Sequence, residues 1–485
     1  MPIHTHCRTA FAAVALAAAG VAHAGTYTVT TTADGGPGSL RQVIADLPPG
    51  EDNEIRFQPG GTGIIVLSVA SDLPLLRGTS VLIEGQYNLG GIVVDGQSTS
   101  RLFFTGNVPT TVRNLTVRNG AGTFNAGCVQ GGGAALTLDN VVVEGCRAGI
   151  GSANAYGGGV SGFGSLTVRR SIFRDNLAMA GTGGGNQSGG AIYYRGQVLI
   201  EDSLFIGNRV ENGPNAFSDG GAAYFFESDV TVRRSRFIDN RVVAPVPGGS
   251  AAGGAIACRR GTCTVEASYF GGNDSAMVGG AVAQEEGALV LRNVVVQDTF
   301  DGYGGAVRVT GAGGQPATLT IDNSTFTDNA IPAWSGYGVH LDVGGNTTVL
   351  RIANSAFGAI EGSPACRLAG DAAGYAGPGF NRAIDDSCDA MLGSDSEQAT
   401  VDQFGLGAPV FGGYVEAPQL AATSVLIDAG NPAVPMPGGD AGACLTLDAN
   451  GHARPSDGNG DGLARCDIGA QEIRSPRLFG NGFET

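Results

Sequence analysis

The stretch GGAIYYRGQVLIEDSLFIGN (189–208) decides the fold, because close variants of it recur along the middle of the chain. Each variant begins with a Gly-Gly-small step, continues with an alternating β-branched run such as VLIED (198–202), and ends in Phe-x-x-Asn. Runs with a period of two that are bounded by Gly and Asn indicate short strands. The Gly-Gly steps begin at Gly132, Gly158, Gly189, Gly220, Gly253, Gly279 and Gly304, at intervals of 26, 31, 31, 33, 26 and 25 residues.

A loosely held period of this kind is typical of a solenoid whose insertions fall in loops. With three short strands per turn, it predicts an all-β protein: a single-stranded, right-handed parallel β-helix of the pectin-lyase-like kind, with the hand taken from the rule for parallel crossovers. In such a fold, the residues that recur in each unit serve packing instead of catalysis. We expect the Phe side chains to stack inside and the Asn side chains to form a ladder at a turn. The Phe-x-x-Asn motifs run from Phe173 to Asn176, Phe205 to Asn208, Phe237 to Asn240, Phe270 to Asn273 and Phe326 to Asn329.

Charged residues four positions before each Phe, or before its apolar equivalent, alternate in sign through eight consecutive units. If equivalent positions stack, every charge has an opposite neighbour in the coils above and below it. A column of serines two positions before the Phe follows the same repeat. The alternating residues are Arg113, Asp139, Arg169, Glu201, Arg233, Glu266, Arg292 and Asp322.

The composition is that of a chain that folds, with 42% hydrophobic and 15% charged residues among 485. The 82 glycines indicate many tight turns. The net charge is −16 and all 28 basic residues are Arg. A negative field of this size makes nucleic acid and anionic membrane surfaces poor partners.

Residues 1–24 have the features of a secretory signal peptide: Arg8, an apolar run over 10–22, and Ala22-His23-Ala24 as the cleavage site. We therefore expect a mature chain that begins near Gly25 and is secreted or held at the cell surface. No other apolar run approaches twenty residues, so we expect no transmembrane segment after cleavage.

Eight cysteines remain after cleavage, and an even number in an exported chain predicts disulfides. The cysteines fall in four local clusters, which favours pairing in sequence order. The expected pairs are Cys128–Cys146, Cys258–Cys263 across a turn, Cys366–Cys388 and Cys444–Cys466.

The ends of the solenoid need covers, because open strand edges invite aggregation. Residues 39–48 have the apolar spacing of a short helix, with Ser39 and Gln42 as a capping box and Pro48 as its stop. We expect this helix to close the N-terminal end. The predicted divisions are 25–107 for the cap and first coils, 108–360 for the repeats, 361–474 for a loop-rich, disulfide-bonded region, and 475–485 for a terminal tag.

Two segments and the repeat resemble known bacterial families. TYTVTTTADGGPGSLRQVI (26–44) resembles the N-terminal CSLREA segment of secreted β-helix proteins, with Gly38, Gln42 and Val43 where that family has Cys, Glu and Ala. The GGA[IV] and FxxN repeats are similar to those of chlamydial-type polymorphic outer membrane proteins, which are β-helical adhesins.

The tail resembles the choice-of-anchor Q domain of surface and secreted proteins, through SVLIDAGNPA (424–433), ARP (453–455) and CDIGAQE (466–472). Together the resemblances imply a secreted or surface-displayed β-helix, with no catalytic residues to carry over. The final RLFGNGFET (477–485) is either a recognition tag or a solvated terminus.

The residues themselves give little support to catalysis, and we assign no catalytic residue. The mature chain has two His, His340 and His452, and no Lys to serve as a lyase base. Hydrolysis needs two carboxylates about 5–9.5 Å apart, whereas Gly207 and Gly272 interrupt the column of acidic residues before the turn Asn, so that Asp175 and Asp239 are two coils, about 10 Å, apart. The acidic residues of this column are Asp175, Asp239 and Asp328, and a further acidic pair, Asp385-Asp386, is expected in a solvated loop.

A calcium ion is the one cofactor that the sequence suggests. Asp457, Asn459 and Asp461 match alternate ligand positions of a calcium loop, with glycines that permit the turn. The position of the closing Glu is taken by Ile468, so a complete EF-hand is excluded. The alternatives are a partial calcium turn, completed by Asp448 or Asp467, and a plain Gly-Asp turn.

We therefore expect an exported, non-catalytic, monomeric β-helix that presents loops for adhesion or for binding a cell-surface glycan or protein. The longest insertions are 177–188, 209–219 and 241–252, and Trp334 lies in a comparable loop. The alternatives are a polysaccharide lyase or glycoside hydrolase on the same fold, and a purely structural envelope protein. A paired carboxylate beside a groove would favour the enzyme.

Overall fold

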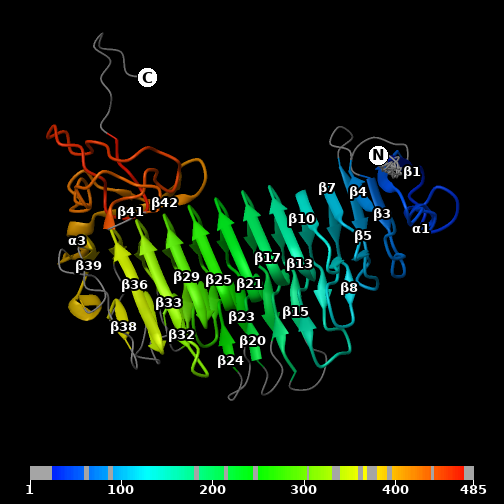
Figure 1. Ribbon diagram of the computed structural model, residues 1–485, viewed down its shortest axis with the longest axis horizontal. Helices are drawn as coiled ribbons and strands as arrows, with labels where there is room; N and C mark the ends of the chain where they lie inside the picture. The colour runs from blue at the N-terminus through cyan, green and yellow to red at the C-terminus, as the bar shows by residue number, and fades with distance from the viewer. Residues whose placement is uncertain are drawn as a thin grey trace, which may run out of the picture.

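The strands of this protein wind into a parallel β-solenoid of about ten turns, elongated along one axis (Figure 1). The computed structural model describes residues 24–58, 65–85, 91–179, 185–211, 217–243, 250–302, 305–329, 339–358, 364–368, 379–389, 396–438 and 442–474. Strand makes up 50% of the structure and helix 4%. The predicted all-β parallel solenoid is confirmed.

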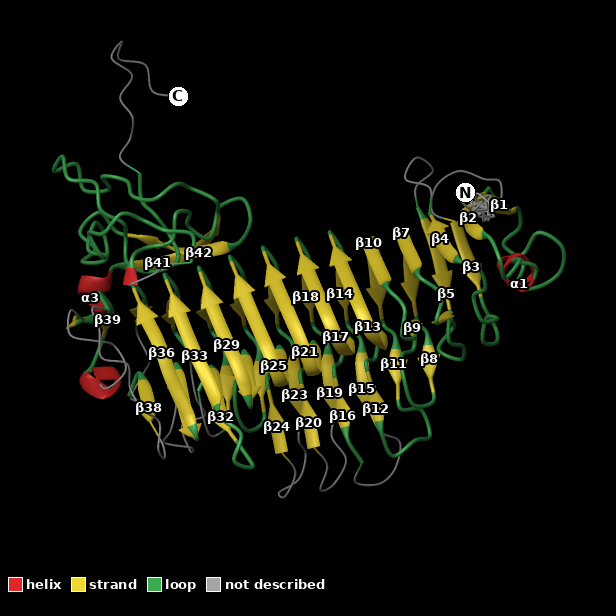
Figure 2. Cartoon of the chain, viewed as in Figure 1, coloured by secondary structure: helices red, strands yellow, loops and turns green. Residues whose placement is uncertain are grey.

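The elements follow the chain from one end of the solenoid to the other (Figure 2). The first coils hold β1 (Ala24–Val29), α1 (Leu40–Ala45), β2 (Asp52–Phe57), β3 (Ile65–Ser68), β4 (Ser80–Glu84), β5 (Ile92–Asp95), β6 (Phe103–Gly106), β7 (Thr110–Arg118), β8 (Ala121–Gly122) and β9 (Val129–Gly131). The middle coils hold β10 (Leu136–Glu144), β11 (Arg147–Ala148), β12 (Ala155–Tyr156), β13 (Val160–Arg169), β14 (Ile172–Arg174), β15 (Leu177–Met179), β16 (Gln187–Ser188), β17 (Ile192–Glu201), β18 (Leu204–Ile206), β19 (Arg209–Glu211), β20 (Phe217–Asp219), β21 (Ala223–Arg233), β22 (Arg236–Ile238), β23 (Arg241–Val243), β24 (Ser250–Ala252), β25 (Ile256–Glu266), β26 (Tyr269–Gly271) and β27 (Asp274–Ser275).

The later coils and the C-terminal region complete the chain. They hold β28 (Val282–Glu285), β29 (Gly287–Arg292), β30 (Val295–Gln297), β31 (Phe300–Asp301), β32 (Val307–Gly311), β33 (Ala317–Asp322), β34 (Thr325–Thr327), β35 (Leu341–Gly345), β36 (Thr347–Ala353), β37 (Ala356–Phe357), β38 (Cys366–Leu368), β39 (Arg382–Ala383), the 3-10 helix η2 (Asp386–Cys388), β40 (Glu397–Gln398), α3 (Val401–Phe404), β41 (Leu406–Phe411) and β42 (Glu416–Leu420).

One coil illustrates how the sequence makes the fold. The long strand β17 alternates buried and exposed side chains, so that Ile192, Tyr194, Val198 and Ile200 point into the core. The chain then turns through β18, β19 and β20, and β21 lies parallel to β17 with Ile192 opposite Ala223. Strands such as β15, β19 and β23 form a seven-stranded sheet, and β12, β16, β20 and β24 form a four-stranded one.

The predicted charge ladder is present on the outer surface of the coils. Consecutive members of the series, from Arg113 to Asp322, are direct partners in the strand register. The Glu201 carboxylate forms an ion pair with Arg169, with Nε 2.9 Å from Oε2, and a second ion pair with Arg233. Opposite charges on neighbouring strands stabilise this register, and the ladder extends beyond the predicted range, since Arg113 also pairs with Glu84.

The Phe rings stack inside and the Asn side chains form a ladder at a turn, as predicted, and the Ser column is buried too. The rings of Phe173, Phe205, Phe237 and Phe270 stack with centroids 4.7–4.9 Å apart. Below them the Asn amides form a buried ladder in which Asn176 Nδ2 donates to Asn208 Oδ1 at 2.8 Å, and Asn208 to Asn240 at 2.9 Å. Backbone N–H groups of the Ser column donate to the hydroxyl of the next Ser, as between Ser171 and Ser203.

The twin glycines serve two different purposes. Gly189 has a φ of 68°, which an L side chain rarely adopts. Gly190 allows close approach between coils, because a Cβ there would lie 2.1 Å from the carbonyl oxygen of Gly221. The same two roles recur at Gly220-Gly221 and Gly253-Gly254, so the step is a packing requirement of these coils.

Helix α1 covers the N-terminal end with Leu40, Val43 and Ile44, which join the core of the solenoid. Ser39 is the N-cap and its hydroxyl accepts the N–H of Gln42 at 3.2 Å. The predicted capping box is wrong in its second half, because the amide of Gln42 binds Asp46 instead of returning to the cap.

Three of the four predicted disulfides are present: Cys128–Cys146, Cys366–Cys388 and Cys444–Cys466. The fourth prediction is wrong, because Cys258 and Cys263 are buried free thiols. We expected a tight turn between them, but both lie in the continuous strand β25, whose corner at Arg260 and Gly261 has φ values of 58° and 117°. Burial and the neighbouring Cys263 raise the pKa of the Cys258 thiol well above its usual value, so it stays protonated.

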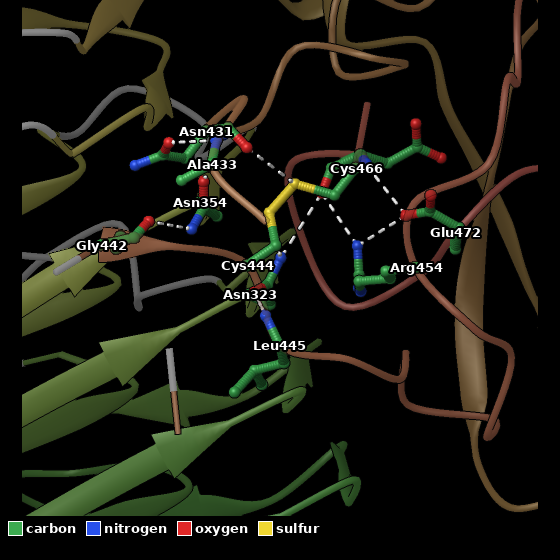
Figure 3. Close-up of a disulfide and its surroundings, with 12 residues drawn as sticks. Asn323, Asn354, Asn431, Ala433, Gly442, Cys444, Leu445, Arg454, Cys466 and Glu472 are labelled. Carbon is green, nitrogen blue, oxygen red and sulfur yellow. Dashed lines mark hydrogen bonds and ion pairs between the residues drawn. A yellow bond between two sulfur atoms is a disulfide. The ribbon is translucent and has the colours of Figure 1, made fainter. Parts of the chain in front are cut away.

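The C-terminal region, 406–474, lies along the flank of the later coils (Figure 1). Three successive coils each carry an Asn at the same turn, and these Asn side chains form hydrogen bonds with the backbone of the C-terminal region. Figure 3 shows two of them, Asn323 and Asn354, beside Cys444–Cys466. The bonds are Asn293 to Leu447 O at 2.8 Å, Leu445 N to Asn323 at 2.9 Å, Asn354 to Gly442 O at 2.8 Å and Asn431 N to Asn354 at 2.8 Å.

Within the described residues, no helix is both long enough and apolar enough to cross a bilayer. The predicted signal peptide (its residues 1–23), Trp334 and the terminal tag (475–485) lie outside the described residues. The divisions at 107, 360 and 474 stay predictions. The sheet continues across the first of them, because β2 pairs with β4 and β4 pairs with β7.

Candidate ligand-binding groove

A cavity of about 640 Å³ is open on the outer surface of the solenoid, between the four-stranded sheet and the first halves of the long strands. Its lining includes Tyr193 and Tyr224 from the long strands, and Phe217 and Asp219 from β20. A second cavity of about 580 Å³ shares Tyr193 with it, and also Tyr156, and adds Phe124, Phe163 and Arg195. We call the two together the aromatic groove.

The strand register explains why aromatic rings gather here. Tyr193 and Tyr224 are partners on neighbouring coils, and Tyr156 ends β12 beside them. The rings form a continuous line: Phe124 to Tyr156 at 5.2 Å, Tyr156 to Tyr193 at 4.8 Å, and Tyr193 to Tyr224 at 5.7 Å between centroids. The line follows the solenoid axis, since each step moves to the next coil.

The outermost aromatic residues expose large apolar surfaces. Phe124, Phe163 and Phe217 are 42%, 56% and 61% exposed. A cluster of exposed aromatic side chains along one groove is typical of a binding surface. Burial raises the pKa values of the Tyr156 and Tyr193 phenols, so both are neutral hydrogen-bonding groups at physiological pH.

Three arginines line the groove and each has a carboxylate partner on a neighbouring coil. Arg259 Nε lies 3.3 Å from Glu285. Arg195 pairs with Glu227, and its guanidinium lies 5.0 Å from the centroid of the Phe226 ring. Arg308 pairs with Asp342.

Asp219 is the exception, because its carboxyl group makes no hydrogen bond or ion pair with any described residue. Burial, with a further contribution from Glu285 that Arg259 opposes, raises the pKa of Asp219 to about 7. Its side chain is half-buried and lines the groove. Asp219 is therefore a polar group that a ligand can reach.

Asp219 and Glu285 lie on coils that are not adjacent. Asp219 is aligned with Ala252, which bridges to Val278, so two strand spacings separate it from the coil of Glu285. That is about 10 Å between backbones, and Glu285 is engaged by Arg259. Arg259 occupies the intervening coil in the same column as Glu285.

The other acidic candidates lie outside the groove. Asp175, Asp239 and Asp328 adopt left-handed turn conformations, with φ values of 54°, 52° and 53°. Asp385 caps η2 and accepts the N–H groups of Ser387 and Ala365 at 3.0 Å. None of these four residues lines the groove, and neither does the fifth candidate, Asp386.

The two histidines of the predicted mature chain are also held away from the groove. His340 is buried between the Asn329 amide and the Gly358 carbonyl, each at 2.9 Å. His452 pairs with Asp448 at 3.1 Å. Neither is placed to act on a ligand in the groove.

The predicted calcium residues lie together in one turn, but their side chains bind the turn itself. Asp457 accepts the N–H groups of Gly460 at 2.7 Å and Gly462 at 3.0 Å. Asn459 and Asp461 accept backbone N–H groups in the same way. Among described residues, no group of three or more His, Cys, Asp or Glu is arranged to hold a metal, and calcium binding by this turn stays a prediction.

The groove was not predicted from the sequence, although a signal was present. The second residue after each GGA is Tyr in two adjacent units, at Tyr193 and Tyr224. In the next three units it is Ala257, Ala283 and Arg308. Such a position points outward on every coil, so large aromatic residues confined to adjacent units indicate a surface patch. The prediction of loops at 177–188, 209–219 and 241–252 is wrong for most of their described residues, which form strands: β15 and β16, β19 and β20, and β23 and β24. Of these, β16, β20 and β24 form one wall of the groove.

Comparison of the sequence with models of protein families and with curated proteins finds no match.

Proposed function

We propose that this chain is an exported β-helix protein that binds an extended glycan along the aromatic groove without cleaving it. Export is supported by the signal-like residues 1–24 and by the resemblance of 26–44 to CSLREA segments. The adhesin-like repeats and the anchor-like motifs within 424–472 support display at the cell surface.

The line of rings from Phe124 to Tyr224 is the observation that carries the proposal. Sugar rings have apolar faces that pack on aromatic side chains and hydroxyl groups that need polar partners. The groove offers both, since Asn186, Ser188 and Asp219 line it beside the aromatic residues. A line that repeats from coil to coil suits a polymer better than a small molecule.

Binding is favoured over hydrolysis by the arrangement of the carboxylates. Asp219 has the raised pKa of a proton donor, but Glu285 lies two coils away and is paired with Arg259. Glu285 is therefore engaged by a guanidinium, which makes it a poor second carboxylate for hydrolysis.

The test is to incubate the mature protein with a panel of soluble polysaccharides and to measure retention by affinity electrophoresis together with the release of reducing ends. We expect retention without new reducing ends. Phe163→Ala should weaken the affinity by about tenfold, because Phe163 is an exposed aromatic residue of the groove and loss of such a contact costs more than about 1 kcal/mol.

Phe300→Ala is the matched control, since Phe300 is a strand residue that is 43% exposed and does not line the groove. Equal retention of Phe163→Ala and Phe300→Ala would show that the glycan binds outside the aromatic groove. Release of reducing ends would overturn the non-catalytic function.

A further inference from the structure

The ionised side chains of the groove are neutralised within the protein. The guanidinium groups of Arg195, Arg259 and Arg308 each face a carboxylate of an adjacent coil. Asp342, the partner of Arg308, is completely buried and also binds Arg367 at 2.8 Å. The three arginines therefore present little net positive charge to a ligand.

A glycan that carries carboxylates needs the opposite arrangement. Recognition of a carboxylate is strongest when a guanidinium offers two parallel N–H donors with no competing anion. Glu285 competes for Arg259, and Glu227 competes for Arg195. A uronate would have to displace a carboxylate that is already in place.

Asp219 adds to this discrimination, because it is the one groove carboxyl group without a partner among the described residues. When ionised it repels a uronate, and in either protonation state it can bind a hydroxyl group. The net charge of −16 on the whole chain acts in the same direction at long range.

Building on the proposed glycan binding, we propose that the aromatic groove selects neutral polysaccharides and rejects polyuronates, with the Arg259–Glu285 pair and Asp219 as the specificity-determining residues. Stacking on Tyr156, Tyr193 and Tyr224 holds the sugar rings. The internal pairing of the charges then decides which polymers can enter.

The experiment compares hydroxyethylcellulose, galactomannan and xyloglucan as neutral probes with polygalacturonate and alginate as acidic probes, at low and high salt. The wild-type protein should bind at least one neutral polymer with little dependence on salt, and the acidic polymers at least about tenfold more weakly. Glu285→Gln should free Arg259 and raise the affinity for polygalacturonate several-fold, and high salt should abolish that gain.

Glu144→Gln is the matched control, because it frees Arg174 from a pair of 2.8 Å between neighbouring coils, and neither residue lines the groove. It should leave the affinity for polygalacturonate unchanged. Asp219→Asn should keep the binding of the neutral polymer and relax the rejection of polygalacturonate.

The outcomes separate the two proposals. Wild-type protein that binds polyuronates as tightly as neutral polymers would overturn the selectivity and leave glycan binding intact. A preference for neutral polymers that Glu285→Gln and Asp219→Asn both leave unchanged would overturn the role of these residues. Absence of binding to every polymer would overturn the glycan function and the selectivity with it.

Discussion

Arg454 and Glu472 form an ion pair that is completely shielded from solvent, with Nη1 2.9 Å from Oε2 and both side chains 0% exposed (Figure 3). Arg454 also donates to the carbonyl oxygens of Asp467 at 2.9 Å and Gly469 at 2.8 Å. Glu472 in turn accepts the N–H groups of Ser456 and Asp467. The pair thus joins the strandless segments of the C-terminal region, which have no sheet to organise them.

Glu472→Gln should destabilise the C-terminal region by about 3–5 kcal/mol, because it leaves a buried guanidinium without its counter-charge. The free energy of unfolding is measured by denaturant titration, with the sensitivity of the region to limited proteolysis as the readout. Glu397→Gln breaks the exposed Arg382–Glu397 pair, in which Glu397 is 71% exposed, and should cost no more than about 1 kcal/mol. Similar losses in the two variants would contradict the importance that we give to the buried pair.

Asn323→Ala should loosen the attachment of the C-terminal region to the solenoid. The variant leaves the buried N–H of Leu445 without its acceptor, at a cost of about 1–3 kcal/mol. Asn140→Ala is the matched control, because Asn140 occupies the equivalent turn with a φ of 56° against 45° for Asn323, and contacts only the solenoid. Protection of 442–474 against hydrogen exchange should fall in the first variant alone.

The fold was accessible from the sequence because stacking depends only on spacing along the chain. The alternation of Arg169, Glu201 and Arg233 indicates the register without any knowledge of the loops, and the register is as predicted. The groove was less accessible, because Tyr156 belongs to a separate short sheet whose position beside Tyr193 follows from packing.

Contacts between distant segments were not accessible at all. The turn residues Asn293, Asn323 and Asn354 differ from their counterparts Arg170 and Asp202, but nothing in the repeat indicates a partner more than 75 residues further along the chain. The thiols of Cys258 and Cys263 gave a wrong disulfide for a related reason. Spacing alone does not distinguish a turn from a strand that bends at one corner.

His340 should make the protein less stable in mild acid. Burial lowers the pKa of its imidazole to about 4, whereas the unfolded chain takes up a proton near pH 6.5. Between these values the unfolded state binds more protons, so stability is complete above about pH 6.5 and is lost as the pH falls towards 4, by up to about 3 kcal/mol.

The difference between the pH profiles of the wild-type protein and His340→Gln isolates this effect, because the carboxylates that titrate over the same range are common to both. The profile of the variant should be flatter between pH 6.5 and 4. His452→Gln is the control, since it removes a histidine that is 38% exposed instead of a buried one. A variant as sensitive to acid as the wild type would contradict the prediction.

The mature protein should contain two free thiols. Three disulfides account for six of its eight cysteines, and the remaining two are Cys258 and Cys263. A thiol reagent should react slowly with the native protein, because both side chains are buried, and should count two thiols after unfolding. A count of zero would show that a fourth disulfide forms, and Cys258→Ser with one reactive thiol left would identify the pair.

Calcium removal should leave the 457–462 turn folded. Each of its three polar side chains already accepts a backbone N–H, and Asp428 accepts two more, from Gly458 at 3.1 Å and Asn459 at 2.9 Å. The turn is thus complete without an ion, so the melting temperature should be the same in excess calcium and in chelator. A rise with calcium that Asp457→Asn abolishes would establish a metal site instead, since a ligand that binds only the folded state raises its stability.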